Sequence, residues 1–521
     1  MKRLPIGIQS FEKLRTADCV YVDKTEDMYR MITLGDVYFL SRPRRFGKSL
    51  LVSALNELFK GNKALFEGLY IYDKWDWTRQ YPVIRIDWTI IQHSTPEELE
   101  RDLSAYLGRI AEDFRLTLGR EYASSRLNEL IELLHRQTGE KVVVLVDEYD
   151  KPITSHLTDT GKIKAVREKL HNIYQVLKGS DNHLQFVFLT GVSKFAGLSI
   201  FSALNNLNDI TLNAKYASIC GYTQQELESH FAEYINDMVR ETGATREDLL
   251  SAIKTWYNGY TWDGKTAVYN PYSTLMFFEN REFANYWFRT GTPTFLMNLL
   301  IQKEYRLEQV LEPITVSSGV FDSYDPERLE EIPLLFQTGY LTIKKKEFVL
   351  MRPHYTLGLP NAEVGEALTE QLLNAYTAYP TGKAESLRER MQEQLRQQDT
   401  AGLEQCLREM LAGIPYLHVV RTEAWYHSVM LLWLRLLGFE LLGEVPTNIG
   451  RIDAVWFFPG HAMVVEVKSR PEESDIARLL DAAIGQIREK RYYERFMGER
   501  QVSLLAVAFA GNEIGCRMEK V

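Results

Sequence analysis

The chain has 521 residues, which at roughly 100–200 residues per domain predicts three or four domains. A hydrophobic fraction of 45% and a charged fraction of 25% exclude disordered, collagen-like and fibrous chains. The formal net charge of −9 excludes a basic protein that coats nucleic acid, but it leaves room for one locally basic groove.

The four cysteines lie far apart and form no CxxC pair, which argues against a zinc knuckle or a disulfide framework. The N-terminal residues show no apolar segment of a secretory signal. No window reaches the roughly 18 uninterrupted apolar residues that a membrane span needs. We therefore expect a soluble, cytoplasmic protein with no membrane partner.

The first 220 residues alternate short apolar runs with amphipathic stretches. The runs are Val37–Leu40, Val83–Ile86, Val142–Val146 and Phe186–Leu189. Helix-like patterns, including 48–60 and 96–118, lie between these runs. Short apolar strands separated by helices are typical of a parallel sheet that is covered on both faces. The pattern predicts an α/β domain over residues 1–220.

A loop of basic and small residues joins the first predicted strand to the helix that follows it. The expected nucleotide contacts of this loop are Arg44, Arg45, Phe46, Gly47, Lys48 and Ser49. Because N–H groups at a helix N-terminus attract anions, we expect Lys48 at the β- and γ-phosphates and the Ser49 hydroxyl on Mg²⁺. Arg42 stands where the G-x-x-x-x-G-K-[ST] pattern has its first glycine, so the match is incomplete.

Two carboxylates, Asp147 and Glu148, end a later apolar strand. Ligands of open α/β sheets bind at the carboxyl ends of the strands. Asp147 would therefore hold Mg²⁺ through water, and Glu148 would orient or activate the attacking water. Thr190 ends a further strand, where a sensor of the γ-phosphate could sit. The alternative for Asp147 and Glu148 is a plain surface turn.

Residues 221–378 are expected to form a helical lid and a winged-helix region, because helices are followed by a helix and a β-hairpin. A polar helical linker is predicted at 379–415, and a smaller α/β domain at 416–521. The last block reads helix (422–437), strand (450–458), strand (462–468), helix (474–494) and strand (502–509).

The hairpin of this last block carries carboxylates and a lysine. Asp453 lies near the start of its first strand. Glu466 and Lys468 lie two residues apart on the second strand, so both side chains point to one face. Such a group can bind Mg²⁺, activate water and stabilise a developing phosphorane charge. The alternative is an ordinary amphipathic strand, because Glu-Val-Lys is a common sequence.

Two helices could complete this site. Glu423, on the helix before the hairpin, could be a metal ligand or a first-turn glutamate favoured by the helix dipole. On the helix after the hairpin, Gln486, Lys490 and Tyr493 share one face. That face could position a phosphate backbone, or it could be a surface helix stabilised by ion pairs.

The segments RPRRFGKS, VVLVDEYDKP and FLTGVSKF, with the order Asp453…Glu466-x-Lys468…Gln486, resemble AAA-ATPase-like proteins that carry a PD-(D/E)xK nuclease domain. The resemblance runs over nearly the whole chain, and the family shares the glycine-poor loop. It implies a nucleotide and Mg²⁺ site at Lys48 and Ser49, a Walker B pair at Asp147 and Glu148, nuclease metal ligands at Asp453 and Glu466, a catalytic lysine at Lys468, a helix carboxylate at Glu423 and an accessory residue at Gln486. Ile452 replaces the proline that the family has before the aspartate.

We expect a protein that binds and hydrolyses ATP and thereby controls a Mg²⁺-dependent nuclease, with DNA favoured over RNA. ATP and Mg²⁺ are the expected cofactors, nucleic acid is the expected partner, and a homo-oligomer stays open. One alternative is a non-cutting switch whose C-terminal domain docks on nucleic acid or on a protein. Another is a nucleotide bound as a structural element. No arginine finger is assigned.

Overall fold

A computed structural model describes the chain except residues 158, 196–205, 288–312, 323–329, 378–380, 413–422, 440–453, 459, 471–474, 492, 499 and 511–512. The chain forms two units, one of residues 1–291 and 314–364 and the other of residues 292–313 and 365–521. The domain boundaries expected at 220, 378 and 415 stay predictions. None of the helices in the described part is both long and apolar enough to cross a membrane.

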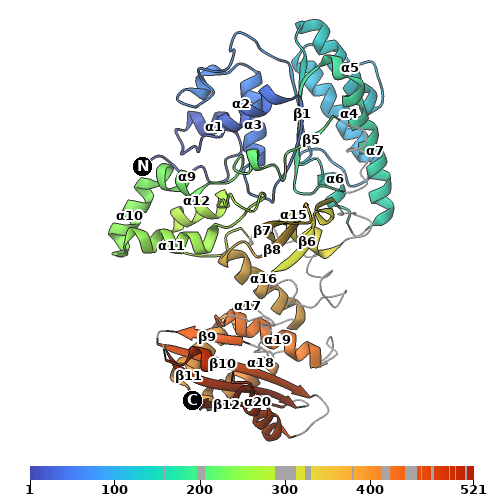
Figure 1. The fold of residues 1–521 in the computed structure, drawn as a ribbon. Helices are drawn as coiled ribbons and strands as arrows, with labels where there is room; N and C mark the ends of the chain where they lie inside the picture. Colours follow the sequence, from blue (N-terminus) through green and yellow to red (C-terminus); the bar gives the residue numbers. More distant parts are fainter. Residues whose placement is uncertain are drawn as a thin grey trace. The chain divides into compact units, whose positions relative to one another are not determined.

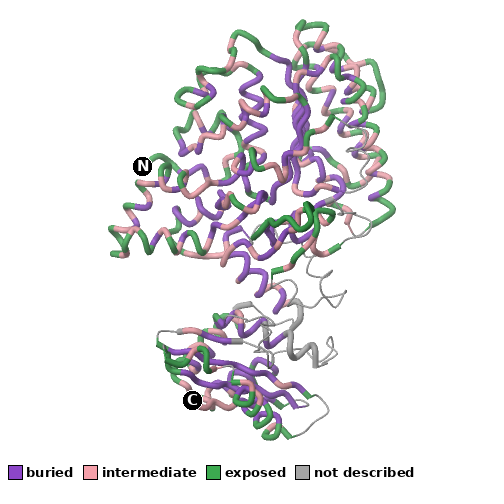
Figure 2. The backbone as a smooth tube through the Cα atoms, in the orientation of Figure 1, coloured by how far each residue is buried: buried purple, intermediate pink, exposed green. Residues whose placement is uncertain are grey.

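A five-stranded parallel sheet forms the centre of the first unit (Figure 1). Its strands are β1 (Val37–Ser41), β2 (Val83–Asp87), β3 (Val142–Asp147), β4 (Leu184–Gly191) and β5 (Asn208–Asp209), in the order β2-β3-β4-β1-β5. Every residue of β1 and β3 is buried, and the sheet is drawn as a purple layer in Figure 2. Helices on both faces exclude water from both faces, which explains the unbroken apolar runs. The expected parallel sheet is confirmed.

Helices cover the two faces of this sheet (Figure 1). One group is α1 (Phe11–Thr16), α2 (Thr25–Leu34) and α3 (Lys48–Phe59), and the other is α4 (Pro96–Asp113), α5 (Ala123–Thr138) and α7 (Thr160–Gly179), with the short α6 (Lys151–Thr154) after β3. The helix expected at 96–118 ends at Asp113, because Arg115 takes a left-handed φ of 59° and Leu116 turns back to bond the Ala111 carbonyl.

The helical region that follows packs around aromatic side chains. Its helices are α9 (Gln224–His230), α10 (Ala232–Thr242), α11 (Arg246–Tyr257) and α12 (Pro271–Asn280). Phe231 stacks on Phe278 with 5.0 Å between ring centroids. The expected helix and hairpin follow as α15 (Glu331–Thr338), β7 (Thr342–Val349) and β8 (Arg352–Gly358). A strand that was not expected, β6 (Ile314–Ser317), pairs antiparallel with β8 and completes a sheet of order β6-β8-β7.

A four-stranded mixed sheet of order β12-β11-β10-β9 forms the centre of the second unit. Its strands are β9 (Ala454–Phe458), β10 (His461–Arg470), β11 (Gln501–Ala510) and β12 (Glu513–Lys520), and its helices are α16 (Ala362–Thr377), which begins in the first unit, α17 (Thr381–Gln397), α18 (Thr400–Ala412), α19 (Glu423–Leu436) and α20 (Ile476–Lys490). β10 and β11 run parallel, and the other pairs are antiparallel. α20 packs its apolar side chains, among them Ala483 and Ile487, onto the sheet. The sequence patterns did not predict β12.

Candidate functional site

The basic loop leaves β1 at Ser41 and enters α3 at Lys48. Arg45 and Gly47 both have left-handed backbones, with φ of 68° and 90°. A Cβ on Gly47 would meet no atom within 4 Å, so glycine is favoured here by its φ and not by a lack of space. The resulting curl ends at the N-terminus of α3, where free N–H groups and the helix dipole favour a phosphate.

The Lys48 ammonium lies inside this curl, and the residue is 5% exposed. Its Nζ donates to the carbonyl oxygens of Arg42 and Pro43, at 3.0 Å each. Burial lowers the pKa of Lys48, while the carboxylates of Glu148 and Asp147 act in the opposite direction. Two carbonyl groups of the loop therefore fix the position of the ammonium before any phosphate arrives.

Arg42, at the position of the missing glycine, anchors the loop to the interior. Its fully buried guanidinium donates to the carbonyl oxygens of Ser41, Thr211 and Tyr216 at 2.8, 2.9 and 3.1 Å. It also lies 3.9 Å from the ring centroid of Trp262. Burial lowers the pKa of Arg42 to about 10. The Arg42 guanidinium is thus bound by groups inside the fold.

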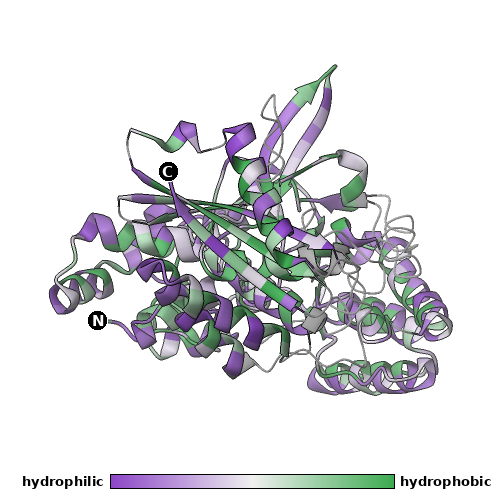
Figure 3. Cartoon of the chain, turned by 90° about the horizontal axis from the view of Figure 1, so that it is seen from below, coloured by the Kyte–Doolittle hydropathy of each residue, from purple (hydrophilic) through white to green (hydrophobic). Residues whose placement is uncertain are grey.

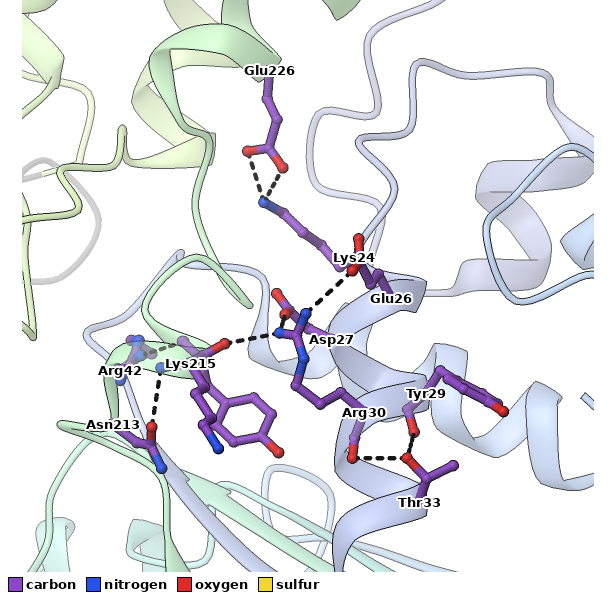
Figure 4. Close-up of polar contacts among 11 residues, drawn as sticks. Lys24, Glu26, Asp27, Tyr29, Arg30, Thr33, Arg42, Asn213, Lys215 and Glu226 are labelled. Carbon is purple, nitrogen blue, oxygen red and sulfur yellow. Dashed lines mark hydrogen bonds and ion pairs between the residues drawn. The ribbon is translucent and has the colours of Figure 1, made fainter. Parts of the chain in front are cut away.

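The segment that receives Arg42 is itself held by α2, as Figure 4 shows. Arg30 of α2 donates to the Lys215 carbonyl at 3.1 Å. Just before α2, Lys24 forms an ion pair with Glu226 of α9 at 2.6 Å. This network ties α2, the segment after β5 and the helical region to the start of the loop.

Phe46 and Arg45 pack against aromatic rings of the helical region. Phe46 is 1% exposed and meets Tyr260 and Trp262 edge-on, at 4.8 and 5.4 Å between centroids. The Arg45 guanidinium lies 4.4 Å from the ring centroid of Tyr272. In this arrangement Phe46 can offer a phosphate only its backbone N–H.

Arg44 connects the loop to a buried carboxyl group. Its carbonyl oxygen accepts from the Trp287 indole N–H at 3.1 Å. The backbone N–H of Trp287 donates in turn to Glu363 Oε1 at 2.7 Å, and the same oxygen accepts from the Ser273 hydroxyl at 3.0 Å. Burial raises the pKa of Glu363 to about 7. The sequence reasoning missed this carboxyl, because nothing in its neighbourhood along the chain distinguishes it.

Asp147 ends β3 and is 1% exposed. Its Oδ1 is buried and accepts no hydrogen bond from the described residues. Burial raises the pKa of Asp147, and the Ser49 hydroxyl and Lys48 oppose this. A buried carboxylate whose Oδ1 accepts no hydrogen bond from the described residues, next to a serine hydroxyl, is a donor set that suits Mg²⁺. The expected pair of Ser49 and Asp147 therefore fits the metal.

Glu148 lies in a left-handed turn, with a φ of 50°. The turn is held by Asp150, which is 2% exposed and accepts from the backbone N–H groups of Ser193 at 2.8 Å and Val192 at 3.2 Å. Burial raises the pKa of Asp150 to about 6. Asp150 thus ties the end of β3 to the end of β4. The sequence reasoning missed this role, which depends on the two strands being neighbours.

Thr190 is fully buried at the end of β4, between β1 and β3. Its hydroxyl donates to the Leu40 carbonyl at 2.8 Å. Just beyond it, the Lys194 ammonium pairs with Asp209 at 2.8 Å. The sensor role of Thr190 stays a prediction, and its hydroxyl is used here to join two strands.

A cavity of about 380 Å³ lies beside the start of the loop. Its lining includes Pro43, Lys194, Asp209, Trp262 and Phe336. This volume lies within the range of small-molecule sites. Its lining combines aromatic rings with a few polar groups.

The second candidate site lies between β10 and α20 in the second unit (Figure 1). Glu466 is 2% exposed, and its Oε1 lies 2.9 Å from the Lys468 ammonium. The same ammonium donates to Gln486 Oε1 at 2.5 Å, and the Gln486 amide nitrogen donates to Glu466 Oε1. The structure therefore brings three of the expected residues into one hydrogen-bonded group.

Small apolar residues of β11 lie beside this group. Ala506 pairs in register with Glu466, and Ala508 pairs with Lys468. Both alanines are buried in the core beneath α20. Because methyl groups cannot bind a buried carboxylate or ammonium, polar partners must come from elsewhere, and Gln486 is one of them.

The structure does not describe the side chains of two further residues expected at this site. Asp453 lies outside the described residues, as does the side chain of Glu423 at the start of α19. Within the described ranges, no group of three or more His, Cys, Asp or Glu residues could hold a metal. Among the metal ligands expected at this second site, Glu466 is the one whose side chain the structure describes. α20 ends at Lys490, and Arg491 takes a left-handed φ of 49°, so Tyr493 lies beyond the helix and does not continue the expected face.

Comparisons with known proteins agree with this geometry. Residues 5–201 match a family described as predicted AAA-ATPase, and residues 421–519 match the PD-(D/E)XK nuclease superfamily. An uncharacterized protein in the vnfD 5' region of Azotobacter chroococcum mcd 1 is 38% identical over 518 residues, covering 98% of this chain and 96% of the relative. The chain therefore belongs to a family of predicted AAA-ATPases that carry a C-terminal domain of the PD-(D/E)XK nuclease superfamily.

Proposed function

We propose that this protein binds and hydrolyses Mg·ATP at the carboxyl edge of its parallel sheet, and that this controls a Mg²⁺-dependent nuclease in its second unit. DNA is favoured over RNA as the substrate. The observation that carries the proposal is the group of Glu466, Lys468 and Gln486, in which a buried carboxylate and an ammonium are held at 2.9 Å.

In the nucleotide site, Lys48 would bind the β- and γ-phosphates, and its ammonium is already positioned by the Arg42 and Pro43 carbonyls. Ser49 and Asp147 would hold Mg²⁺, which when bound neutralises phosphate charge. Glu148 would orient the attacking water. The cavity beside Pro43 would receive the nucleoside.

In the nuclease site, Glu466 would bind Mg²⁺, which when bound activates water and polarises the scissile phosphate. Lys468 would place its ammonium near the charge that develops on phosphorus. Gln486 would hold both side chains in position, since its amide contacts each of them.

The test is cleavage of supercoiled plasmid by the full chain in Mg²⁺ or Mn²⁺, with and without ATP. We expect the wild type to cut, and Glu466→Gln and Lys468→Ala to lose cleavage while still binding ATP. Glu513→Gln and Lys520→Ala are matched controls on the exposed ends of β12, and both should cut normally.

Two outcomes would contradict the proposal. Cleavage that persists in both Glu466→Gln and Lys468→Ala would remove the assignment of the nuclease site. A wild type that hydrolyses ATP but never cuts in either metal would favour the non-cutting switch.

Glu148→Gln tests the coupling between the two sites. This variant should bind ATP without hydrolysing it, and its rate of plasmid cleavage should differ from that of the wild type.

A further inference from the structure

The β7–β8 hairpin ends in an exposed apolar turn. Leu350 and Met351 are 93% and 94% exposed, and Phe348 and Val349 before them are 69% and 52% exposed. Figure 3 shows hydrophilic strands that end in a hydrophobic tip. Single exposed apolar residues are ordinary. A run of four exposed apolar residues is not, and packing within its own unit does not account for it.

The backbone of this turn is also unfavourable for its residues. Val349 pairs with Arg352, so Leu350 and Met351 form a two-residue turn. Their φ angles of 49° and 64° are both left-handed. Such turns ordinarily use Asn-Gly or Asp-Gly, because larger side chains are strained in this region. The fold therefore holds two bulky apolar side chains in water at a cost in free energy. This indicates that the two side chains contact a partner of the folded unit.

Basic side chains flank the turn. Residues 342–358 contain four basic residues and one acidic residue, in a chain whose net charge is −9. Lys345, Lys346 and Arg352 are exposed, and Lys345 pairs with Glu347 at 2.6 Å. A cationic stem with an apolar tip is complementary to a partner with anionic edges and an apolar interior. Duplex nucleic acid has this chemistry, because its phosphates surround stacked bases.

We propose that the β7–β8 hairpin docks on duplex DNA, with Leu350 and Met351 pressed against the base pairs in the minor groove and Lys346 and Arg352 on the phosphates. This inference rests on the proposed function, which makes nucleic acid the substrate. An anionic membrane would meet the same charges. A tip of four apolar residues buries too little area to anchor there unaided.

The test measures binding of the full chain to a fluorescent 30-bp duplex by anisotropy, in EDTA so that cleavage cannot occur. The central variant is Leu350→Asn with Met351→Gly, which removes the apolar tip and supplies residues that the turn prefers. We expect this variant to bind the duplex at least tenfold more weakly, with a melting temperature equal to or above that of the wild type. Lys346→Gln with Arg352→Gln should lower the salt slope of binding by about two.

Leu34→Asn is the matched control, because Leu34 is 64% exposed at the end of α2, away from the hairpin in sequence. It should bind the duplex as the wild type does. Unchanged duplex affinity in the tip variant would overturn the inference. The inference would also fail if the tip variant lost binding to phosphatidylserine vesicles but kept its binding to the duplex. Because binding is measured without cleavage, a wild type that binds through the tip but never cuts would contradict the proposed function and leave the hairpin assignment standing.

Discussion

The two candidate sites hold a lysine in opposite ways. In the nucleotide site, backbone carbonyls of Arg42 and Pro43 bind the Lys48 ammonium. In the nuclease site, the side chains of Glu466 and Gln486 bind the Lys468 ammonium. Lys48 is almost fully buried, whereas the Lys468 side chain is 30% exposed.

These two kinds of contact predict which substitutions each site tolerates. A cradle of carbonyl groups survives most side-chain changes as long as the loop keeps its shape, so residues that support the loop from a distance matter. A group built from three side chains depends on each of them. We therefore expect substitutions that disturb the packing around the loop to affect the first site, and substitutions of the three polar side chains to affect the second site.

Lys48→Ala should have the largest effect. It removes the charge that would contact the phosphates, and charge-assisted hydrogen bonds of this kind are worth up to about 3 kcal/mol. We expect Mg·ATP affinity, measured by calorimetry, to fall about 100-fold, with DNA binding retained. Lys60→Ala, at the other end of α3, is the control and should bind ATP normally. An unchanged ATP affinity in Lys48→Ala would show that the loop alone binds the phosphates.

Glu363→Gln tests the buried carboxyl group that contacts the loop through Trp287. The folded state raises the pKa of Glu363 from 4.5 to about 7, so ionisation opposes folding. The unfolding free energy of the wild type should fall as the pH rises from 4.5 to 7, by at most about 3 kcal/mol from this group. Glutamine keeps an oxygen for Trp287 and Ser273 and cannot ionise, so the variant should lose this dependence.

The measurement for Glu363→Gln is thermal unfolding at several pH values, followed by tryptophan fluorescence. The exposed Glu282→Gln is the control and should follow the wild type. If the wild type and Glu363→Gln lose stability equally between pH 4.5 and 7, the carboxyl does not titrate in this window.

Gln486→Leu tests the side-chain site. Leucine keeps the volume and removes both amide contacts, while the direct pair of Lys468 and Glu466 remains. Residues that orient a metal ligand typically contribute about 10- to 100-fold. We therefore expect plasmid cleavage to slow by that factor, with the metal concentration for half-maximal rate raised. Glu489→Gln, exposed on the same helix, should cut normally. A normal rate in Gln486→Leu would make Gln486 a packing residue.

Thr190→Val should have the smallest effect. The hydroxyl donates to the Leu40 carbonyl, and a neutral hydrogen bond of this kind is worth about 1 kcal/mol. We expect a small loss of thermal stability and an ATPase rate close to that of the wild type. A large fall in the rate with unchanged ATP affinity would instead support the γ-phosphate sensor.

Much of the architecture follows from short-range patterns. The apolar runs that became β1, β3 and β4 are buried on both faces, so each of their residues is apolar and indicates the strand. β2, at the edge of the sheet, has the half-buried Arg85 in its run. Short-range patterns also indicate Gly47-Lys48-Ser49 at a strand-to-helix junction, and Glu466 and Lys468, whose spacing of two sets a common face. The strand β12 was missed because Glu513, Arg517 and Lys520 make it read as a surface segment. Its alternating Ile514 and Cys516 carry the signal, and pairing with β11 stabilises it.

Other features depend on contacts between residues far apart in the chain. The order of residues places a lysine and a serine directly after a strand, but only the folded chain turns Arg42 inward onto Trp262. Only the folded chain brings Trp287 and Glu363 to the loop, and Gln486 on a helix to Lys468 on a strand. Strand and helix patterns depend on neighbours a few residues away. Burial of a charge is stable only when its partners are folded around it, and those partners are chosen by packing.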